Sequence, residues 1–403
     1  MIKRPLTVVM LLTGLNLLNY LDRWLIAAVS PNIQRELGLS DAQTGGVGSA
    51  FLWGYLLFSP LVALLGERVR RTWLIGAGVA LWCLATAGSG LAATFATLIA
   101  MRVAVGIGEA SYASLSPTLI DEISPAAKKA RTLAIFYAAI PVGSALGFVV
   151  GGALDAAIGW RAAFYVAGGP GVLLALSCFF IVDAPPKPRE RRAGLVEALR
   201  GTLRSPRYVW LVAGFIAQTF ALGGFGFWAP HFLERTFHME LSKANTTLGG
   251  ILVVTGLAGA ILGGVVADRS RDHDRVRAQV RVCAVTAALA VPFAAWAVLA
   301  GSPVAFFVAL GLAELFIFSS TAPFNAALMA SVPFGLRAMA MAFSIFAGHL
   351  LGDIISEPLV GELSDRLGSL RPAMYVLAAA VVVNALAWGA ALRARQVVDE
   401  PAS

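Results

Sequence analysis

The sequence predicts an all-α membrane protein with twelve transmembrane helices in two pseudo-symmetric six-helix bundles. Of its 403 residues, 58% are hydrophobic and only 13% are charged, whereas a soluble domain carries about 25% charged residues. Four residues recur at the same internal spacing 210 positions apart: Gly151, Asp155, Arg161 and Tyr165 match Gly361, Asp365, Arg371 and Tyr375. A largely apolar chain that repeats itself at half its length is typical of a transporter whose halves move about a central site.

Twelve apolar runs of roughly 20 residues, the length that crosses a bilayer, lie between charged or Gly/Pro-rich breaks. The first is too long for the apolar core of a cleavable signal peptide, so we read it as a membrane span. Cys83, Cys178 and Cys283 all fall in apolar stretches and predict neither a disulfide nor a metal site. The expected spans are 6–29, 41–65, 72–93, 95–120, 131–154, 160–182, 208–232, 244–267, 279–300, 303–329, 337–362 and 370–392.

The positive charges are distributed unevenly between alternate loops. Of the 31 Lys and Arg residues, 23 fall on the side that holds both termini and six on the other, while Arg23 and Arg102 lie inside spans. The excess predicts that both termini lie in the cytoplasm. We expect a multi-pass protein of the plasma (inner) membrane. The net charge of +8 is then explained by topology, with anionic membrane lipids rather than nucleic acid as its partner.

The longest polar stretch, 183–207, divides the chain into an N-terminal bundle (1–182) and a C-terminal bundle (208–403). It contains Pro185, Pro186 and Pro188, followed by a basic cluster. Residues 194–203 fit a short amphipathic helix on the inner leaflet, with Arg200 and Arg204 towards headgroups. A solvated linker fits equally well.

Inserting an ionisable side chain into the middle of a membrane span costs about 2.5–3.5 kcal/mol of free energy on the insertion scale. Each such residue therefore suggests a specific role. In the first span Asn16, Asn19, Tyr20 and Arg23 share one helical face and Asp22 borders it. This face has to look into protein or a water-filled cavity, with Asp22 neutralising Arg23 or another arginine. A fixed internal ion pair is the alternative.

The fourth span places Arg102 and Glu109 on one side of a helix rich in small residues. A buried carboxylate whose arginine partner can move is suited to proton-driven transport. Arg102 lies near the start of its span, so its side chain could instead extend to the membrane–water interface. In the fifth span Gly143, Gly147 and Gly151 form a face for close helix contact.

The second half carries its own polar set. His349, Asp353 and Glu357 are spaced four apart on one face of the eleventh span, and Pro358 predicts a bend nearby. His349 with Asp353 fits a proton-handling pair or a hydrogen-bonded packing pair. Glu314 and Asn325 lie in the tenth span, and the seventh interleaves aromatic residues, Phe225 and Trp228 among them, with glycines. Such aromatics are either packing residues or a pliable cavity wall.

The chain has no glycine-rich phosphate loop, no metal-ligand spacing and no Ser/His/Asp arrangement. ATP-driven transport, metal chemistry and hydrolysis are therefore disfavoured. We expect neither an enzyme nor a bound cofactor.

Several motifs resemble known sequences. The loop 63–71, with Glu67 and Arg68, and the loop 263–269, with Asp268 and Arg269, resemble the signature loops of the major facilitator superfamily. Four stretches and a tail motif resemble its Spinster family of lysolipid and sphingosine-1-phosphate transporters: Asn19-Tyr20-Leu21-Asp22-Arg23, residues 106–112 around Glu109, residues 135–144, His349-Leu350-Leu351-Gly352-Asp353 and Ser364-Asp365-Arg366-Leu367.

The resemblance implies the major facilitator fold and an amphiphilic substrate with one acyl or sphingoid chain, moved by alternating access. It implies that the two signature loops latch the cytoplasmic side. It also implies a central cavity lined by Asp22, Arg23, Arg102, Glu109, His349 and Asp353.

We therefore expect a proton-coupled, monomeric transporter of lysophospholipid or sphingolipid-like amphiphiles. Arginine matches phosphate in a bidentate way, and the carboxylates would exchange protons as they free or capture it. The substrate-binding residues would be Arg23, Arg102, Tyr112, Phe225, Trp228 and Asn325, and the proton-coupling and gating residues Asp22, Glu109, His349 and Asp353. An exchanger of hydrophilic organic anions or drugs, and a non-transporting receptor or scaffold, are the alternatives.

Overall fold

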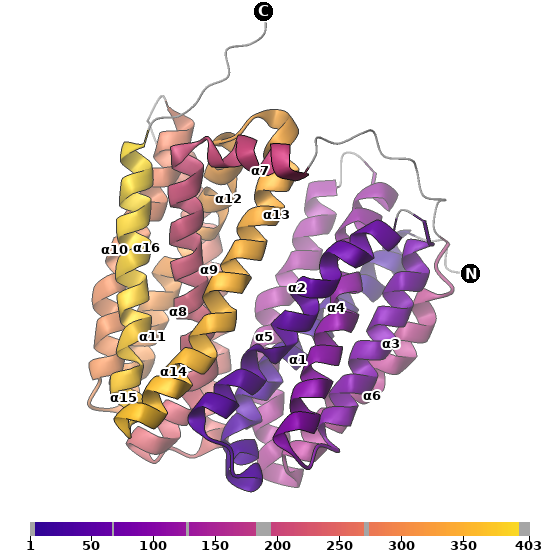
Figure 1. Ribbon diagram of the computed structural model, residues 1–403, viewed down its shortest axis with the longest axis vertical. Coiled ribbons are helices and arrows are strands. Elements are labelled where there is room, and N and C mark those ends of the chain that lie inside the picture. Colours follow the sequence, from indigo (N-terminus) through magenta and orange to yellow (C-terminus); the bar gives the residue numbers. More distant parts are fainter. Residues whose placement is uncertain (1–4, 67, 126–128, 183–194, 270–273, 395–403) are drawn as a thin grey trace, which may run out of the picture. The chain divides into compact units, whose positions relative to one another are not determined.

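The computed structural model describes residues 5–66, 68–125, 129–182, 195–269 and 274–394 (Figure 1). Within these ranges twelve helical segments are long and apolar enough to cross a membrane. This confirms the all-α membrane class, and an observed helical segment coincides with each of the twelve expected spans. The helices of the third and sixth spans end at Ser89 and Cys178, each four residues before the expected end.

The first six spans are single helices. The first continues eight residues past its expected end, and Gly38, with φ of 63°, ends it in the left-handed conformation that glycine adopts easily. The bounds are α1 (Pro5–Leu37), α2 (Asp41–Leu65), α3 (Arg71–Ser89), α4 (Phe95–Ile123), α5 (Lys129–Ile158) and α6 (Trp160–Cys178).

A short helix, α7 (Leu195–Leu203), precedes the second half. Of the two alternatives that the sequence left open here, the structure contains the helix. Its Arg200 side chain is exposed. The remaining spans are formed by α8 (Pro206–Phe237), α9 (Leu241–Asp268), α10 (Arg275–Leu299), α11 (Pro303–Ser319), α12 (Thr321–Ala330), α13 (Arg337–Gly348), α14 (Ile354–Leu367), α15 (Leu370–Ala373) and α16 (Tyr375–Arg393).

Three of the expected second-half helices are interrupted. The tenth span breaks between α11 and α12, where the Ser320 hydroxyl donates to the carbonyl of Ile317 at 2.6 Å and to Gln218 Oε1 at 3.3 Å. The eleventh contains a π-helical turn, His349–Asp353, between α13 and α14. In a regular helix the ring of Pro358 would crowd the carbonyl of Ile354, four residues earlier. The π-helical turn ends at Asp353, directly before Ile354. The twelfth is interrupted between α15 and α16.

Glycines set the closest helix contacts in the first half. A methyl group on Gly143 would lie 2.5 Å from the carbonyl oxygen of Leu17, and one on Gly147 would lie 2.6 Å from that of Leu21. The expected glycine face of α5 therefore packs against α1, which confirms that prediction. A methyl group on Gly106 of α4 would lie 1.8 Å from the carbonyl oxygen of Phe51, so α2 and α4 approach each other even more closely at this point.

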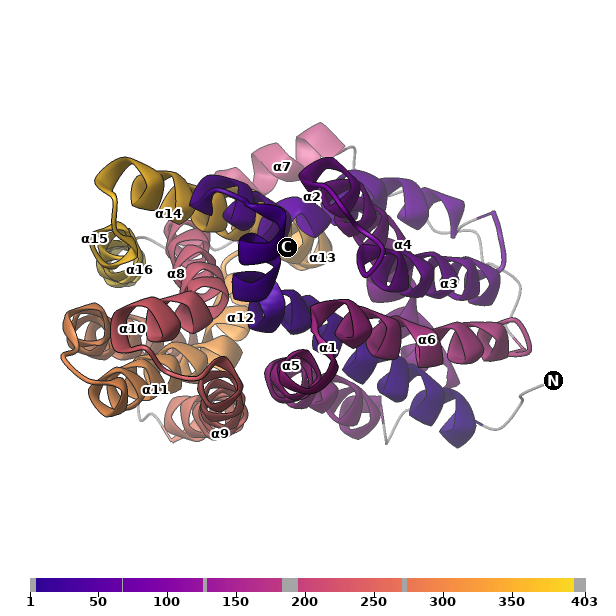
Figure 2. The ribbon, with the colours of Figure 1, turned by 90° about the horizontal axis from the view of Figure 1, so that it is seen from below.

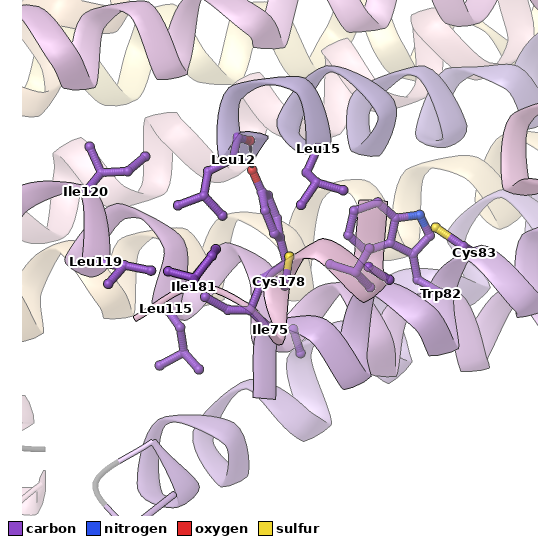
Figure 3. Packing of buried hydrophobic residues seen from close by; sticks show 14 of the residues in the cluster. Leu12, Leu15, Ile75, Trp82, Cys83, Leu115, Leu119, Ile120, Cys178 and Ile181 are labelled. Atoms are coloured by element: carbon purple, nitrogen blue, oxygen red, sulfur yellow. Dashed lines mark hydrogen bonds between the residues drawn. The ribbon is translucent and has the colours of Figure 1, made fainter. Parts of the chain in front are cut away.

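Figure 2 looks along the helices and shows α1 beside α5 and α6, in agreement with their contacts. Helix α4 contacts α2 and α3. Apolar side chains from α1, α3, α4 and α6 form a core in which Leu12 and Leu15 project from α1 near Trp82 and Cys83 of α3 (Figure 3). This core is the scaffold on which the polar faces of α1 and α4 are carried.

The chain forms two compact units. The first comprises residues 1–189 together with 227–253, and the second comprises residues 190–226 together with 254–403. Both helices α8 and α9 therefore contribute to both units.

The internal repeat is visible as a shared contact. Arg161, at the start of α6, donates to the carbonyl of Ala92 at 3.0 Å, just after α3. Arg371, in α15, donates to the carbonyl of Ala300 at 3.0 Å, just after α10. In each half the repeated arginine thus ties the sixth span to the end of the third.

Candidate binding and proton-coupling site

The charged residues of the first and fourth spans meet inside the first unit. Asp22 and Arg23 come from α1, and Arg102 and Glu109 from α4. The side chains of Arg102 and Glu109 have no exposed surface, Asp22 is 2% exposed and Arg23 is 13% exposed. We call these four residues the charged cluster.

The cluster contains two arginine–carboxylate contacts. Arg23 donates from Nε to Glu109 Oε2 at 2.8 Å, and its Nη2 lies 2.7 Å from the same oxygen. Arg102 Nη1 lies 3.8 Å from Asp22 Oδ2, which also accepts a hydrogen bond from Thr86 at 2.9 Å. The sequence allowed Asp22 to pair with Arg23 or with another arginine. In the structure Asp22 pairs with Arg102, and Arg23 pairs with Glu109.

Aromatic rings surround the Arg23 guanidinium. Its central carbon lies 5.1 Å from the ring centroids of Tyr20 and Phe51 and 5.4 Å from that of Tyr55. Phe51 is shared, since the Arg102 guanidinium lies 5.4 Å from it. Cation–π contact stabilises a desolvated guanidinium without consuming its hydrogen-bond donors.

The sequence argument missed Phe51, Tyr55 and Thr86. Phe51 and Tyr55 are four residues apart and so share a face of α2. That spacing is a usable signal, but only the glycine contact at Gly106 shows which helix the face meets. Nothing in the sequence singles out Thr86.

Several buried polar atoms of the cluster make no hydrogen bond to the described residues. These are all three guanidinium nitrogens of Arg102, Oδ1 of Asp22 and Oε1 of Glu109. Buried polar groups in proteins are normally paired. The cluster therefore holds both donor and acceptor capacity that a bound anion, a proton or water can satisfy.

The other expected substrate-binding residues lie in different surroundings. Tyr112 is buried in the core of the first unit, with its hydroxyl bonded to the carbonyl of Leu12 and its ring edge-on to Trp82. Trp228 is fully buried in the first unit, next to Phe227 and His231, and Phe225 is buried in the second. Asn325 is half-buried in α12 of the second unit. The structure thus does not gather these four around one point of the first unit.

His349 and Asp353 form a pair within the second unit. Nδ1 of His349 lies 2.8 Å from Oδ2 of Asp353, and the side chains are 23% and 19% exposed. The pair begins and ends the π-helical turn, and such turns are frequent at functional sites. Gly223 of α8 lies against Asp353, since a methyl group there would be 3.3 Å from the carboxylate.

The expected cytoplasmic latch is only partly within the described residues. Glu67 lies outside them. Arg68 is exposed beyond the end of α2, and Asp268 and Arg269 are exposed at the end of α9. Their assignment stays a prediction.

Comparisons with known proteins agree with one another. The family model of the Major Facilitator Superfamily matches residues 12–356. The chain is 34% identical to human "Protein spinster homolog 1", over 93% of this chain and 75% of that protein. It is 32% identical to the Arabidopsis thaliana "Probable sphingolipid transporter spinster homolog 2", over 93% and 84% of the two chains.

Among solved structures, the crystal structure of a bacterial homologue of human Spinster, described as inward-facing and occupied, superposes with a TM-score of 0.85. It covers 99% of this chain and 100% of that chain at 22% identity, which shows the same fold. The chain belongs to the Spinster family of the Major Facilitator Superfamily.

Proposed function

We propose that the protein is a proton-coupled secondary transporter of lysophospholipid or sphingolipid-like amphiphiles, working by alternating access. The observation that carries this proposal is the charged cluster, with its two arginine–carboxylate contacts in a buried, aromatic-lined setting. The printed name of the plant relative, a probable sphingolipid transporter, supports the substrate class. A transporter rather than an enzyme is the role consistent with the family.

The arginines would bind the headgroup. Guanidinium groups pair with phosphate through two parallel hydrogen bonds, and the three guanidinium nitrogens of Arg102 make no hydrogen bond to the described residues. A headgroup arriving at Arg23 competes with Glu109 for the same donors. The same competition arises between the headgroup and Asp22 at Arg102.

Protons would enter at the carboxylates. A proton on Glu109 removes the negative charge that holds Arg23 and so releases the guanidinium to the headgroup; Asp22 would act on Arg102 in the same way. Proton uptake and headgroup binding are then linked through the arginines. His349 and Asp353 would form the corresponding gate in the second unit.

The topology is also part of the proposal. The lysine and arginine bias supports a plasma (inner) membrane protein with both termini in the cytoplasm, functioning as a monomer. The signature loops with Glu67, Arg68, Asp268 and Arg269 would latch the cytoplasmic side. Tyr112, Phe225, Trp228 and Asn325 would contact the substrate in other stages of the cycle.

The test uses purified protein in liposomes with an imposed pH gradient. We expect Glu109→Gln to keep the thermal stabilisation by lysophospholipid but to lose the effect of the gradient on flux. Glu122→Gln is the matched control, because Glu122 lies at the exposed end of the same helix, paired with Arg71. A Glu109→Gln protein that remains fully driven by the gradient overturns the proton assignment. Stabilisation by organic acids and not by lysolipids overturns the substrate assignment in favour of a hydrophilic anion exchanger.

A further inference from the structure

A second polar site lies in the first unit, where α1 and α8 end. A cavity of about 490 Å³ opens to solvent there and is lined by residues of both helices. The polar lining residues are Gln34, Arg35, His231, Glu234, Arg235 and His238. None of them belongs to the charged cluster.

Ion pairs connect the helices around this cavity. Arg35 lies 2.8 Å from Glu234, and Arg235 forms a two-pronged contact with Asp41 at 2.7 and 2.8 Å. Arg235 also donates to Gln34 at 2.6 Å. We call Arg35, Asp41, Glu234 and Arg235 the arginine clamp, because they join α1 and the start of α2 to the end of α8.

A side-chain hydrogen bond also joins the start of α9 to α1. Asn245 of α9 donates to the carbonyl of Ala28 at 3.0 Å. A methyl group on Gly249 would lie 2.7 Å from the carbonyl oxygen of Ala145. The end of α8 and the start of α9 are therefore packed closely on α1 and α5, with the clamp as the charged part of the contact.

His231 is the buried titratable group behind the clamp. Its side chain has no exposed surface, and it packs against the rings of Trp228 and Phe227 at centroid distances of 5.0 and 6.0 Å. The carbonyl of Phe227, one turn earlier, faces the ring. Neither ring nitrogen makes a hydrogen bond of good geometry with the described residues. The imidazole thus lines a polar cavity without a well-formed hydrogen bond to the described residues.

The charges that face His231 come from three helices. Arg35 of α1 and Arg235 of α8 are the positive ones, and Asp41 of α2 is the negative one. Glu234, in the last turn of α8, and His238, just after the helix, also line the cavity. A proton on His231 would add a third positive charge to a site whose two arginines are balanced by two carboxylates.

We propose that His231 is a proton-binding site that opens the arginine clamp. A charged imidazole repels both guanidinium groups and competes with them for Asp41 and Glu234, so the clamp loosens and the ring becomes hydrated. Acidification on the side of the membrane where α1 and α8 end then favours separation of the end of α8 from α1 and α2. This site goes beyond the proposed function, since it needs neither the substrate assignment nor the carboxylates of the charged cluster.

The size of the effect follows from proton linkage. A hydrated imidazole gains its proton near pH 6.5. If only the opened arrangement admits the proton, lowering the pH from 7.5 to 5.5 raises the ratio of opened to closed protein by up to about tenfold.

The experiment measures that ratio directly. Spin labels at Ala93 and Lys243, both exposed in the first unit, are attached in a variant whose three native cysteines are replaced by alanine. Distance distributions are recorded in lipid nanodiscs at pH 7.5 and 5.5 without substrate. We expect a longer-distance population that grows several-fold at pH 5.5.

His231→Gln should remove this growth, because the amide cannot take up a proton. His231→Phe, which keeps an aromatic ring against Trp228 and Phe227 but has no ionisable group, should keep the clamp closed at both pH values. It also covers the case in which the glutamine variant does not fold. His238→Asn is the matched control: it removes an exposed imidazole from the same cavity, and asparagine tolerates the backbone φ of 53° at this position. It should retain the wild-type response.

A pH response that persists in the folded His231 variants overturns the proposal, as does its loss in His238→Asn. Glu109→Gln separates the two proposals, because it should lose proton-driven flux while keeping the distance change. Loss of the distance change in Glu109→Gln but not in His231→Gln would place the opening proton in the charged cluster instead.

Discussion

The two halves share a scaffold and differ in charge. Arg161 and Arg371 occupy repeated positions and tie equivalent helices in the same way. The first half buries four ionisable side chains in one cluster, whereas the His349–Asp353 pair is about one-fifth exposed and Glu314 is bonded to Thr255 at 3.0 Å. Sequence repetition thus accounts for the frame, while the chemistry resides in residues that the repeat does not copy.

The largest effect is expected at Arg23, which belongs to the charged cluster of the first half. Arg23→Gln should reduce lysophospholipid flux at least a hundredfold and lower stability by about 3–5 kcal/mol, since Glu109 is left buried without its partner. Adding Glu109→Gln should restore thermal stability but not flux, because the headgroup still lacks its arginine. Flux into liposomes and thermal unfolding measure the two effects. Recovery of both in the double variant would reduce Arg23 to a structural partner.

Close packing of the first half should be the next most sensitive feature. Gly143→Ala places a methyl group 2.5 Å from a backbone carbonyl of α1, and such overpacking costs about 1–3 kcal/mol. Gly389→Ala in α16 is the control, since nothing lies within 4 Å of the added methyl and a mid-helix glycine costs roughly 0.5–1 kcal/mol relative to alanine. Thermal unfolding in detergent should therefore shift in opposite directions, and a Gly143→Ala protein as stable as wild type would contradict the close contact.

The repeated arginines should behave alike. Arg161→Met and Arg371→Met each remove charge-assisted hydrogen bonds to carbonyls at the end of the third span of their half, worth about 1–3 kcal/mol. The additional contact of Arg161 with Glu36 is half-exposed on the carboxylate side and should add little. Unfolding midpoints that differ by more than the equivalent of about 1 kcal/mol would show that the two ties are not equivalent.

The smallest effect is expected at His349. A proton on the imidazole would turn its contact with Asp353 into an ion pair, so we expect the π-helical turn to be better protected from amide exchange at pH 5 than at pH 8. The measured amide-exchange rates must be corrected for the pH dependence of the intrinsic exchange rate. His349→Gln should fold normally and lose this difference; a difference that survives would leave the pair as packing alone.

Composition and periodicity were sufficient for the helices but not for their interruptions. Bilayer length and charge breaks predict each span, because hydrophobic burial in lipid requires about 20 apolar residues. The break at Ser319 and Ser320 lies one turn before Pro323, whose ring would crowd the carbonyl of Ser319 in a continuous helix. A count of apolar residues does not register this proline, nor the contact of Ser320 with Gln218, far away in sequence. The π-helical turn lies close to the bend predicted from Pro358 because the proline perturbs the preceding turn.

The site was predictable at the level of single helices. The spacing of residues along one helix predicts that Arg102 and Glu109 share a side of α4 and that the polar residues of α1 share a face, because helical geometry is local. The cross-pairing of Arg23 with Glu109 and of Asp22 with Arg102 depends on how α1, α2 and α4 approach one another. Glycine contacts such as those of Gly106 and Gly143 determine that approach, and a single helix contains no information on its partner.

The discontinuity of the first unit has a consequence for biosynthesis. Residues 227–253 belong to this unit, yet the ribosome makes them only after α7 and most of α8. Until then Asp41 lacks Arg235, and Arg35 lacks Glu234. The first six helices can enter the membrane in order, but their packing is completed only once the second half has begun to insert. A chain terminated at the connecting segment should accordingly be recognised by membrane quality control as an incomplete product.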